Sequence, residues 1–154
     1  MSTEISVLSE AGLLSIEEWQ RAIDAEGFPL KLSKDPPLDN SGGSLTVQLH
    51  DEVISIEYRI EAFTPLKEFR KDVDFGHDWK WVIAFPWITG FSGLTAAWMA
   101  AVAYARAISG AVFDPQEAKV FNQAQARDVI QRIERNRPKA EAALRHISQK
   151  RFKD

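Results

Sequence analysis

Residues 81–105 read WVIAFPWITGFSGLTAAWMAAVAYA and contain no charged side chain over 25 consecutive positions. A helix that crosses a bilayer needs roughly 20 predominantly apolar residues, so this stretch is long enough to be a membrane anchor. The same composition is also typical of the buried centre of a globular domain. Residues that interrupt regular structure within the stretch decide between these two interpretations. They therefore also decide the fold.

Three residues that interrupt regular structure, Pro86, Gly90 and Gly93, divide the stretch. The part around Pro86 is rich in aromatic and β-branched residues, which favours a strand. The part after Gly93 is dominated by alanine, the strongest helix former. The flanking Lys80 and Arg106 show none of the asymmetry of positive charge that orients a membrane span. We therefore predict a core strand, a turn and a buried helix that packs beside the strand, without a membrane span.

Capping signals and periodicity predict the remaining elements. Ser15 and Glu18 have the spacing of a capping box, and Gly27 suits the left-handed position after a helix. Apolar residues alternate with polar ones on both sides of a turn at 50–52, which predicts a β-hairpin. The other predicted elements are strands at 4–8 and 28–32, a short helix from Pro65, a small hairpin within 111–121, and a last helix capped by Asn122 and Gln125.

In this order the elements predict a single α+β domain over residues 1–154. We expect a mixed or mainly antiparallel sheet of about five to six strands, with helices packed on one face and a long C-terminal helical segment. Residues 34–43 concentrate Pro, Asp, Asn, Ser and Gly and are predicted to form a surface loop. Pro138 is expected to break or restart the last helix, which makes residues 138–154 a helical tail.

Two features bear on the cellular compartment: the lack of cysteine and the acidic character of the first residues. Without cysteine the chain can form no disulfide, thiolate zinc site or cysteine nucleophile, which suits a reducing compartment. The opening residues MSTEISVLSEAGLL carry acidic side chains where a secretory signal would carry positive charge. We therefore expect a cytoplasmic protein.

Charge is distributed unevenly along the chain. Residues 1–78 contain 16 Asp and Glu against 7 Lys and Arg, a balance of −9, whereas residues 79–154 contain 6 against 12, a balance of +6. Two solvated surfaces that merely differ would explain this distribution. The alternative is a polarised molecule whose acidic side attracts a basic partner.

An acidic loop, DVDFGHDW, is the main candidate for chemistry. Asp72, Asp74, His77 and Asp78 could hold a divalent ion or act as acid and base. Their spacing does not match the calcium-loop pattern, so an ordinary polar loop is the favoured interpretation. We predict no catalytic residue, no metal ligand and no cofactor. A small metal-dependent enzyme that uses the Asp72–Asp78 loop remains an alternative.

The basic C-terminal segment raises the question of nucleic-acid binding. Residues 127–154 hold nine Lys and Arg against four Asp and Glu, with Phe152 as the only aromatic residue. Asp128 and Arg132 are four residues apart, as are Glu141 and Arg145, so part of this charge pairs along a helix surface. A nucleic-acid-associated regulator that uses these helices is a further alternative, although a solvated helix face is the favoured interpretation and no nucleic-acid partner is expected.

A succession of elements in this chain resembles small bacterial immunity proteins that accompany polymorphic or type VI secretion toxins. The residues concerned are LSIEEWQRAIDAEGFPLKL near the start, and then an alanine-rich helix that ends at Gly110, a strand at 111–113 and a turn at 114–116. The resemblance implies a non-enzymatic protein that binds and neutralises a cognate toxin. It carries over no functional residue, because such proteins recognise toxins through divergent surfaces.

If that implication holds, the acidic half of the chain is the expected contact for a toxin with a basic surface. Trp79 is included because tryptophan is enriched at binding hot spots. No membrane partner is expected, and a homodimer is compatible with the sequence. The predicted partner-binding residues are Glu57, Glu61, Asp72, Asp74, Asp78 and Trp79.

Overall fold

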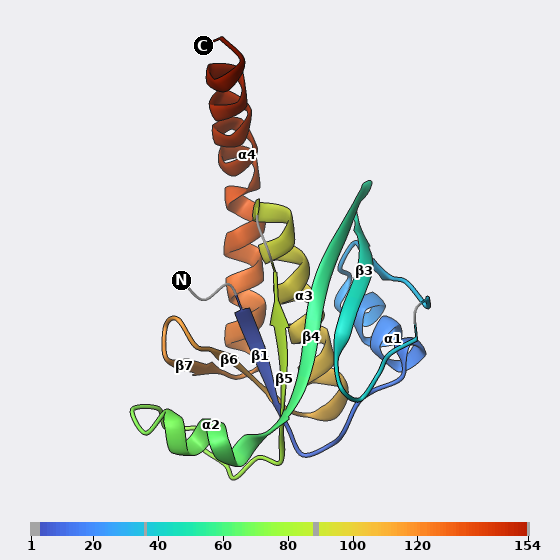
Figure 1. Cartoon of the computed structure of the whole chain (residues 1–154), viewed down its shortest axis with the longest axis vertical. Helices are drawn as coiled ribbons and strands as arrows, with labels where there is room; N and C mark the ends of the chain where they lie inside the picture. The colour runs from blue at the N-terminus through green and yellow to red at the C-terminus, as the bar shows by residue number, and fades with distance from the viewer. Residues whose placement is uncertain (1–3, 36, 88–89, 154) are drawn as a thin grey trace.

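Helix α3 (Gly90–Ile108) crosses the middle of the protein behind the sheet, as the composition of this segment predicts (Figure 1). The structure is a computed structural model that describes residues 4–35, 37–87 and 90–153, with residues 140–153 described by their backbone. In the described ranges, no helix is both long enough and apolar enough to span a membrane. The other helices are α1 (Ile16–Glu26), α2 (Phe63–Phe69) and α4 (Gln123–Lys153).

Seven strands within the described ranges form one sheet in the order β2-β3-β4-β5-β1-β6-β7, and all neighbours are antiparallel. The α+β class is therefore confirmed. The sheet has one strand more than the five to six expected, although each strand lies in a segment that the sequence analysis assigns to a strand or hairpin; β2 and β7 are only three residues long. The strands are β1 (Glu4–Ser9), β2 (Leu30–Leu32), β3 (Gly43–Leu49), β4 (Glu52–Ala62), β5 (Trp81–Pro86), β6 (Ala111–Asp114) and β7 (Lys119–Phe121).

Strand β4 joins the two halves of the sheet. Residues 52–58 pair with β3 across the predicted turn, and residues 59–62 pair with β5. The period of two buries Ile56 and Tyr58 and leaves Glu57 exposed on the opposite face. A shift of this register by one residue would exchange the two faces, so the buried residues determine the pairing.

The first core lies between one face of the sheet and helices α1, α3 and α4. All residues of α3 from Thr95 to Ala105 are buried. Because alanine side chains are short, Trp19 of α1 comes close enough for its Nε1–H to donate to the Ala100 carbonyl at 3.0 Å. The ring of Tyr104 packs edge-on against Trp19, with 5.2 Å between centroids. Burial raises the pKa of Tyr104 to about 12, so its hydroxyl stays neutral.

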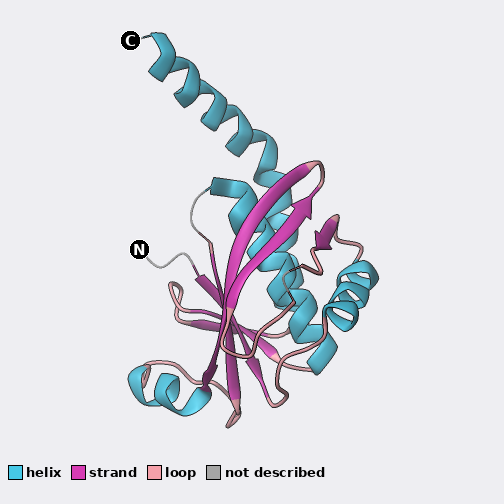
Figure 2. Cartoon of the chain, turned by 45° about the vertical axis from the view of Figure 1, so that its right-hand side comes forward, coloured by secondary structure: helices cyan, strands magenta, loops and turns pink. Residues whose placement is uncertain are grey.

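A second, smaller core lies on the opposite face of the sheet. Leu8, Val82 and Phe113 from the strands pack there with Phe63 and Phe75. Three helices cover the first face as predicted, whereas α2 and the loop after it cover this second face (Figure 2). Helix α2 also begins two residues before the predicted start at Pro65, since proline is tolerated in the first turn of a helix.

Three helices meet at a buried carboxylate, which we call the Glu26 clamp (Glu26, Arg106 and Arg127). The side chain of Glu26, at the end of α1, is 3% exposed. Its Oε1 accepts from Arg106 Nη1 of α3 at 2.7 Å, and its Oε2 lies 2.8 Å from Arg127 Nε of α4. The second contact is an ion pair without the alignment of a hydrogen bond. A buried carboxylate needs its cations, so the positions of the three helices depend on one another.

The predicted helix ends are confirmed at three places and differ at the end of α3. Ser15 accepts from Glu18 N at 3.1 Å, Gly27 has φ 76°, and Asn122 and Gln125 cap each other at 3.0 and 2.9 Å. After α3 the left-handed position belongs to Ser109 (φ 53°), and not to the predicted Gly110.

The prediction that Pro138 breaks or restarts the last helix is wrong. Helix α4 runs from Gln123 to Lys153 with Pro138 inside it, and its C-terminal part extends beyond the sheet and the other helices (Figure 2). A proline inside a helix removes one backbone hydrogen bond and kinks the helix locally, but the turns on both sides can continue. The helical character predicted for residues 138–153 is thus observed as part of one long helix.

Candidate partner-binding surface

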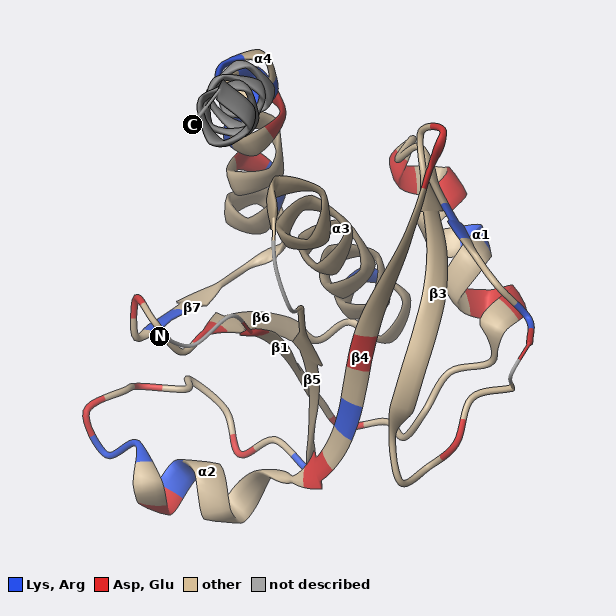
Figure 3. Ribbon diagram, turned by 45° about the horizontal axis from the view of Figure 1, so that its top comes forward, with Lys and Arg blue, Asp and Glu red and all other residues tan. Residues whose placement is uncertain are grey.

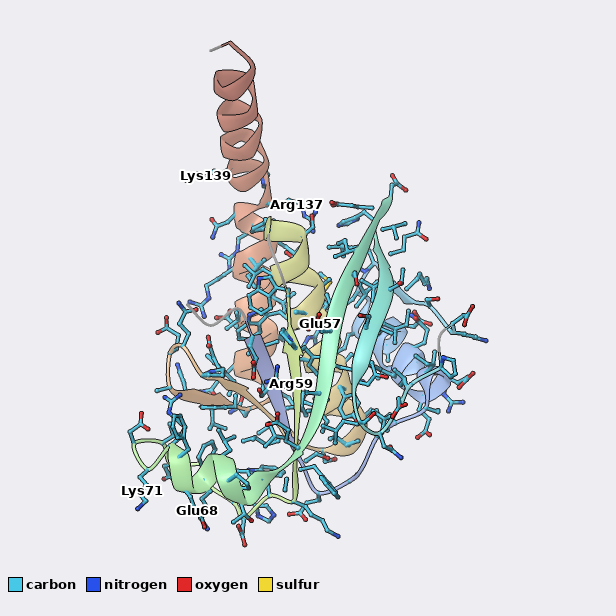
Figure 4. All side chains as sticks on the ribbon, viewed as in Figure 1. Glu57, Arg59, Glu68, Lys71, Arg137 and Lys139 are labelled. Atoms are coloured by element: carbon cyan, nitrogen blue, oxygen red, sulfur yellow. The ribbon has the colours of Figure 1, made fainter. Side chains whose placement is uncertain are left out.

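Five of the six predicted contact residues lie on or beside one segment, residues 63–80, which consists of α2 and the loop after it. We call its exposed surface the α2 rim. Glu61 is the penultimate residue of β4, close to the start of the segment. The sixth residue, Glu57, lies earlier on β4, away from α2 (Figure 4). Glu57 and Glu61 project from the same face of the sheet that the rim covers. The other members of the predicted set are Asp72, Asp74, Asp78 and Trp79.

Aromatic packing fixes the rim to the sheet. The ring of Phe75 lies 5.1 Å from that of Phe63 and 5.1 Å from that of Phe113, both edge-on. The backbone N–H of Phe63 donates to the Lys80 carbonyl at 3.1 Å, so the two ends of the segment are held together. Edge-to-face aromatic pairs contribute about 0.5–1.5 kcal/mol each beyond the area they bury. The rim is therefore a supported surface, although α2 is short.

Arg70 organises the loop immediately after α2. Its Nε and Nη2 donate to both carboxylate oxygens of Asp72 at 3.1 and 3.2 Å, and its Nη1 donates to the Pro115 carbonyl at 3.1 Å. Its guanidinium also lies 5.7 Å from the centre of the Phe113 ring. The hydrogen bond from Arg70 lowers the pKa of Asp72, and the same bond raises the pKa of Arg70. Asp72 thus has a structural partner within the rim, while 59% of its side chain remains exposed.

The remaining acidic residues of the rim also have local partners. Asp74 accepts from the Gly76 N–H at 2.9 Å, which closes a turn. Asp78 lies 3.5 Å from Lys67 Nζ, and its side chain is 81% exposed. Glu61 pairs with Arg59 at 3.1 Å. The acidic side chains closest to being available for a partner are therefore Asp78 and, on β4, the exposed Glu57.

The rim carries no net acidic charge. Residues 63–80 contain four Lys and Arg and four Asp and Glu, so the acidic excess of the first half lies in residues 1–62, with 12 acidic against 4 basic residues. Acidic residues lie on α1 and at the tip of the β3–β4 hairpin, while both signs alternate around α2 (Figure 3). The expected attraction of a basic partner would thus come from the molecule as a whole more than from the rim.

Trp79 is partly buried and not a free anchor. Its Nε1–H donates to the Phe75 carbonyl at 3.1 Å, and its ring lies 4.7 Å from that of His77. His77 in turn contacts the carboxylate of Glu10 through Nε2. Trp79 therefore contributes one face to the second core and its remaining surface to the rim.

The most exposed large apolar side chain in the described ranges is one that the sequence reasoning did not select. Phe69, the last residue of α2, is 84% exposed, and Val53 at the start of β4 follows at 71%. Phe69 stands between the charged Glu68 and Arg70. The sequence pattern that could have indicated this exposure is a phenylalanine with a charged residue on each side at the end of a helix. Phe69 is a candidate binding anchor, because a few large side chains carry most of the binding energy at protein interfaces.

A metal-dependent enzyme finds no support in the loop. Among the described residues, no group of three or more His, Asp and Glu side chains is placed to hold a metal ion. The candidate ligands instead engage other groups: Asp72 pairs with Arg70, Asp78 lies near Lys67, and His77 contacts Glu10. What the rim offers chemically is an aromatic anchor with mixed charges around it.

Comparison with known proteins does not add to this picture. No protein-family model matches the chain, and neither a curated protein sequence nor a solved structure is significantly similar to it.

Proposed function

We propose that this chain is a non-enzymatic binding protein that acts by direct contact with another protein, as immunity proteins act on their toxins, and that the α2 rim is the contact surface. The exposure of Phe69 on a supported helix carries this proposal. Because most of the binding energy at interfaces comes from a few aromatic or arginine anchors, one such residue is enough to define a centre.

The surroundings of Phe69 support the same role. Lys67, Lys71 and Asp78 are exposed on the same segment, and a polar border of both signs favours a specific partner over non-specific apolar association. The aromatic packing beneath the rim limits the entropy lost on binding, since the backbone of the anchor is already held. The proposed activity takes place in the cytoplasm and requires no cofactor.

The test uses the protein product of a toxin-domain gene adjacent to the gene for this chain, with the affinity measured by isothermal titration calorimetry. We expect a complex, and Phe69→Ala should raise its Kd by about 10- to 30-fold, the effect of losing a hot-spot residue. Val53→Ala is the matched control, because it removes the other highly exposed apolar side chain away from the rim, and it should leave Kd unchanged.

A charge variant separates attraction from anchoring. Asp78→Lys reverses the charge of an exposed side chain. Its only described ion pair, with Lys67, is long, so the fold should tolerate the substitution. For a basic partner this variant should slow association and make it less dependent on salt. Equal affinities for Phe69→Ala and the parent chain would remove the α2 rim from consideration, and the absence of any complex would reject the proposed function.

A further inference from the structure

A groove on the other side of the molecule has the composition of a ligand site. One wall is α4, and the other consists of the end of α1 with the residues after it and the β3–β4 turn. Its volume is about 720 Å³, within the range of roughly 300–1,000 Å³ that is typical of small-molecule sites. We call it the α4 groove. Its apolar lining is provided by Phe28, Pro29, Met99 and Ile130.

The charged side chains of the α4 groove have partners both inside and outside its lining. Two acidic residues, Glu26 and Glu134, and two arginines, Arg127 and Arg135, line it. However, Glu26 is also paired with Arg106, at 2.7 Å, and Glu134 accepts from Arg137 at 3.2 and 2.9 Å. Neither Arg106 nor Arg137 belongs to the lining.

The lining itself is balanced, with two arginines and two glutamates. Both glutamates also have an arginine partner outside the lining, so they do not fully occupy the two lining arginines. Arg135 has no acidic partner among the residues that the structure describes, and its Nε makes only a long contact, 3.5 Å, with the Gln131 carbonyl of its own helix. The Arg127 side chain is 51% exposed and meets Glu26 through Nε, so its terminal nitrogens can serve a further acceptor.

The placement of these cations on the helix favours one kind of ligand. Arg127, Gln131 and Arg135 are spaced by four residues, so they follow one another along one face of α4, with roughly 6 Å of rise between neighbours. This row of donors borders the apolar lining of the groove. An anionic head group would meet the donors while an apolar body covers Phe28 and Pro29.

We propose that the α4 groove binds a small anionic molecule with an apolar body, such as a carboxylate on an aliphatic or aromatic frame. The row of donors on α4, Arg127, Gln131 and Arg135, and the size of the groove carry this proposal. The site is separate from the α2 rim, and the proposal does not depend on the proposed function.

The experiment uses anilinonaphthalene sulfonate, an anionic aromatic probe, with the full chain at neutral pH. Its fluorescence should rise and saturate at one probe per chain while the near-ultraviolet circular dichroism stays native. Decanoate should displace the probe, whereas decyltrimethylammonium, with the same apolar chain and the opposite charge, should not.

Charge variants on α4 locate the site. Arg135→Glu and Gln131→Glu, both at exposed positions that line the groove, should each weaken probe binding at least fivefold. Arg132→Glu is the control: it changes the total charge as much as Arg135→Glu, but it lies on another face of α4 and pairs with Asp128.

Three results would overturn the proposal. The first is the absence of saturable probe binding to the native protein, or binding that occurs only with loss of the near-ultraviolet signal. The second is an equal effect of Arg132→Glu and Arg135→Glu, which would indicate attraction by net charge alone. The third is displacement by the cationic amphiphile as effective as that by decanoate.

Discussion

Asp114 is a charged residue in surroundings that disfavour its charge. It ends β6 in a half-buried position, and burial raises its pKa, although hydrogen bonds from the Gln116 and Glu117 N–H groups act in the opposite direction. These two bonds, at 3.0 and 3.4 Å, shape the turn into β7. The turn thus needs a side-chain acceptor at this position, but it does not need a carboxylate.

Asp114→Asn should therefore stabilise the protein slightly at neutral pH. Because the pKa of Asp114 is raised by folding, its contribution to stability is fully present below the ordinary aspartate pKa and is lost as the pH rises through the folded value. Asparagine keeps the acceptor and removes the ionisation. We expect a higher Tm than that of the parent at about pH 7 and no difference at about pH 3. A lower Tm at neutral pH would show that the turn requires the charge.

Two residues, Gln20 and Gly110, shape the contacts between neighbouring elements. At the edge of the sheet, the Gln20 side chain of α1 accepts from Leu32 N at 2.8 Å and donates to the Leu30 carbonyl at 3.0 Å, which protects strand β2 from pairing with another chain. Between α3 and β6, a Cβ atom on Gly110 would lie 2.3 Å from the Leu8 carbonyl oxygen of β1. Gly110 is therefore required for space, while Ser109 provides the left-handed turn.

Gly110→Ala should weaken the junction of β1, α3 and β6. The added methyl group meets a backbone atom that can move only if the pairing of Leu8 with Ala111 shifts, so we expect a loss of about 1–3 kcal/mol. Gly12→Ala is the control, because no heavy atom lies within 4 Å of its added Cβ, and its effect should stay within about 0.5 kcal/mol. Urea denaturation measures both, and similar losses for the two variants would contradict this explanation.

The whole molecule is one sheet with a core on each face, and the two faces have different tasks. The larger core holds three helices, whose mutual positions depend on the Glu26 clamp. The smaller core supports the α2 rim. Because the rim and the α4 groove are built on opposite sides of the sheet, changes at one surface should leave the other intact.

Glu26→Gln tests the clamp at this scale. The amide can accept from one arginine but presents donors to the other, so we expect a loss of about 2 kcal/mol in the free energy of unfolding, the usual value of a hydrogen bond to a charged group. Asp128→Asn breaks the exposed pair with Arg132 within α4 and should cost about 0.5 kcal/mol or less. Equal losses would mean that the clamp holds the helices no more strongly than a surface pair does.

The sequence by itself determined the elements whose signals are local. Pro86, Gly90 and Gly93 separate the core strand from the alanine-rich helix, and Ser15, Gly27 and Asn122 set helix ends, because caps and periodicity act within a few residues. These signals were sufficient for the α+β class and for the assignment of the uncharged stretch to the interior.

Only the tertiary structure decided which surface each element presents and which charges remain available. The ion pair between Asp72 and Arg70 and the exposure of Phe69 at the end of α2 are visible only in the folded chain. The α4 groove joins residues from 26 to 135, and no local pattern links them. The physical reason is that burial and ion pairing depend on contacts between distant parts of the chain, whereas helix caps and strand alternation depend on neighbours in sequence.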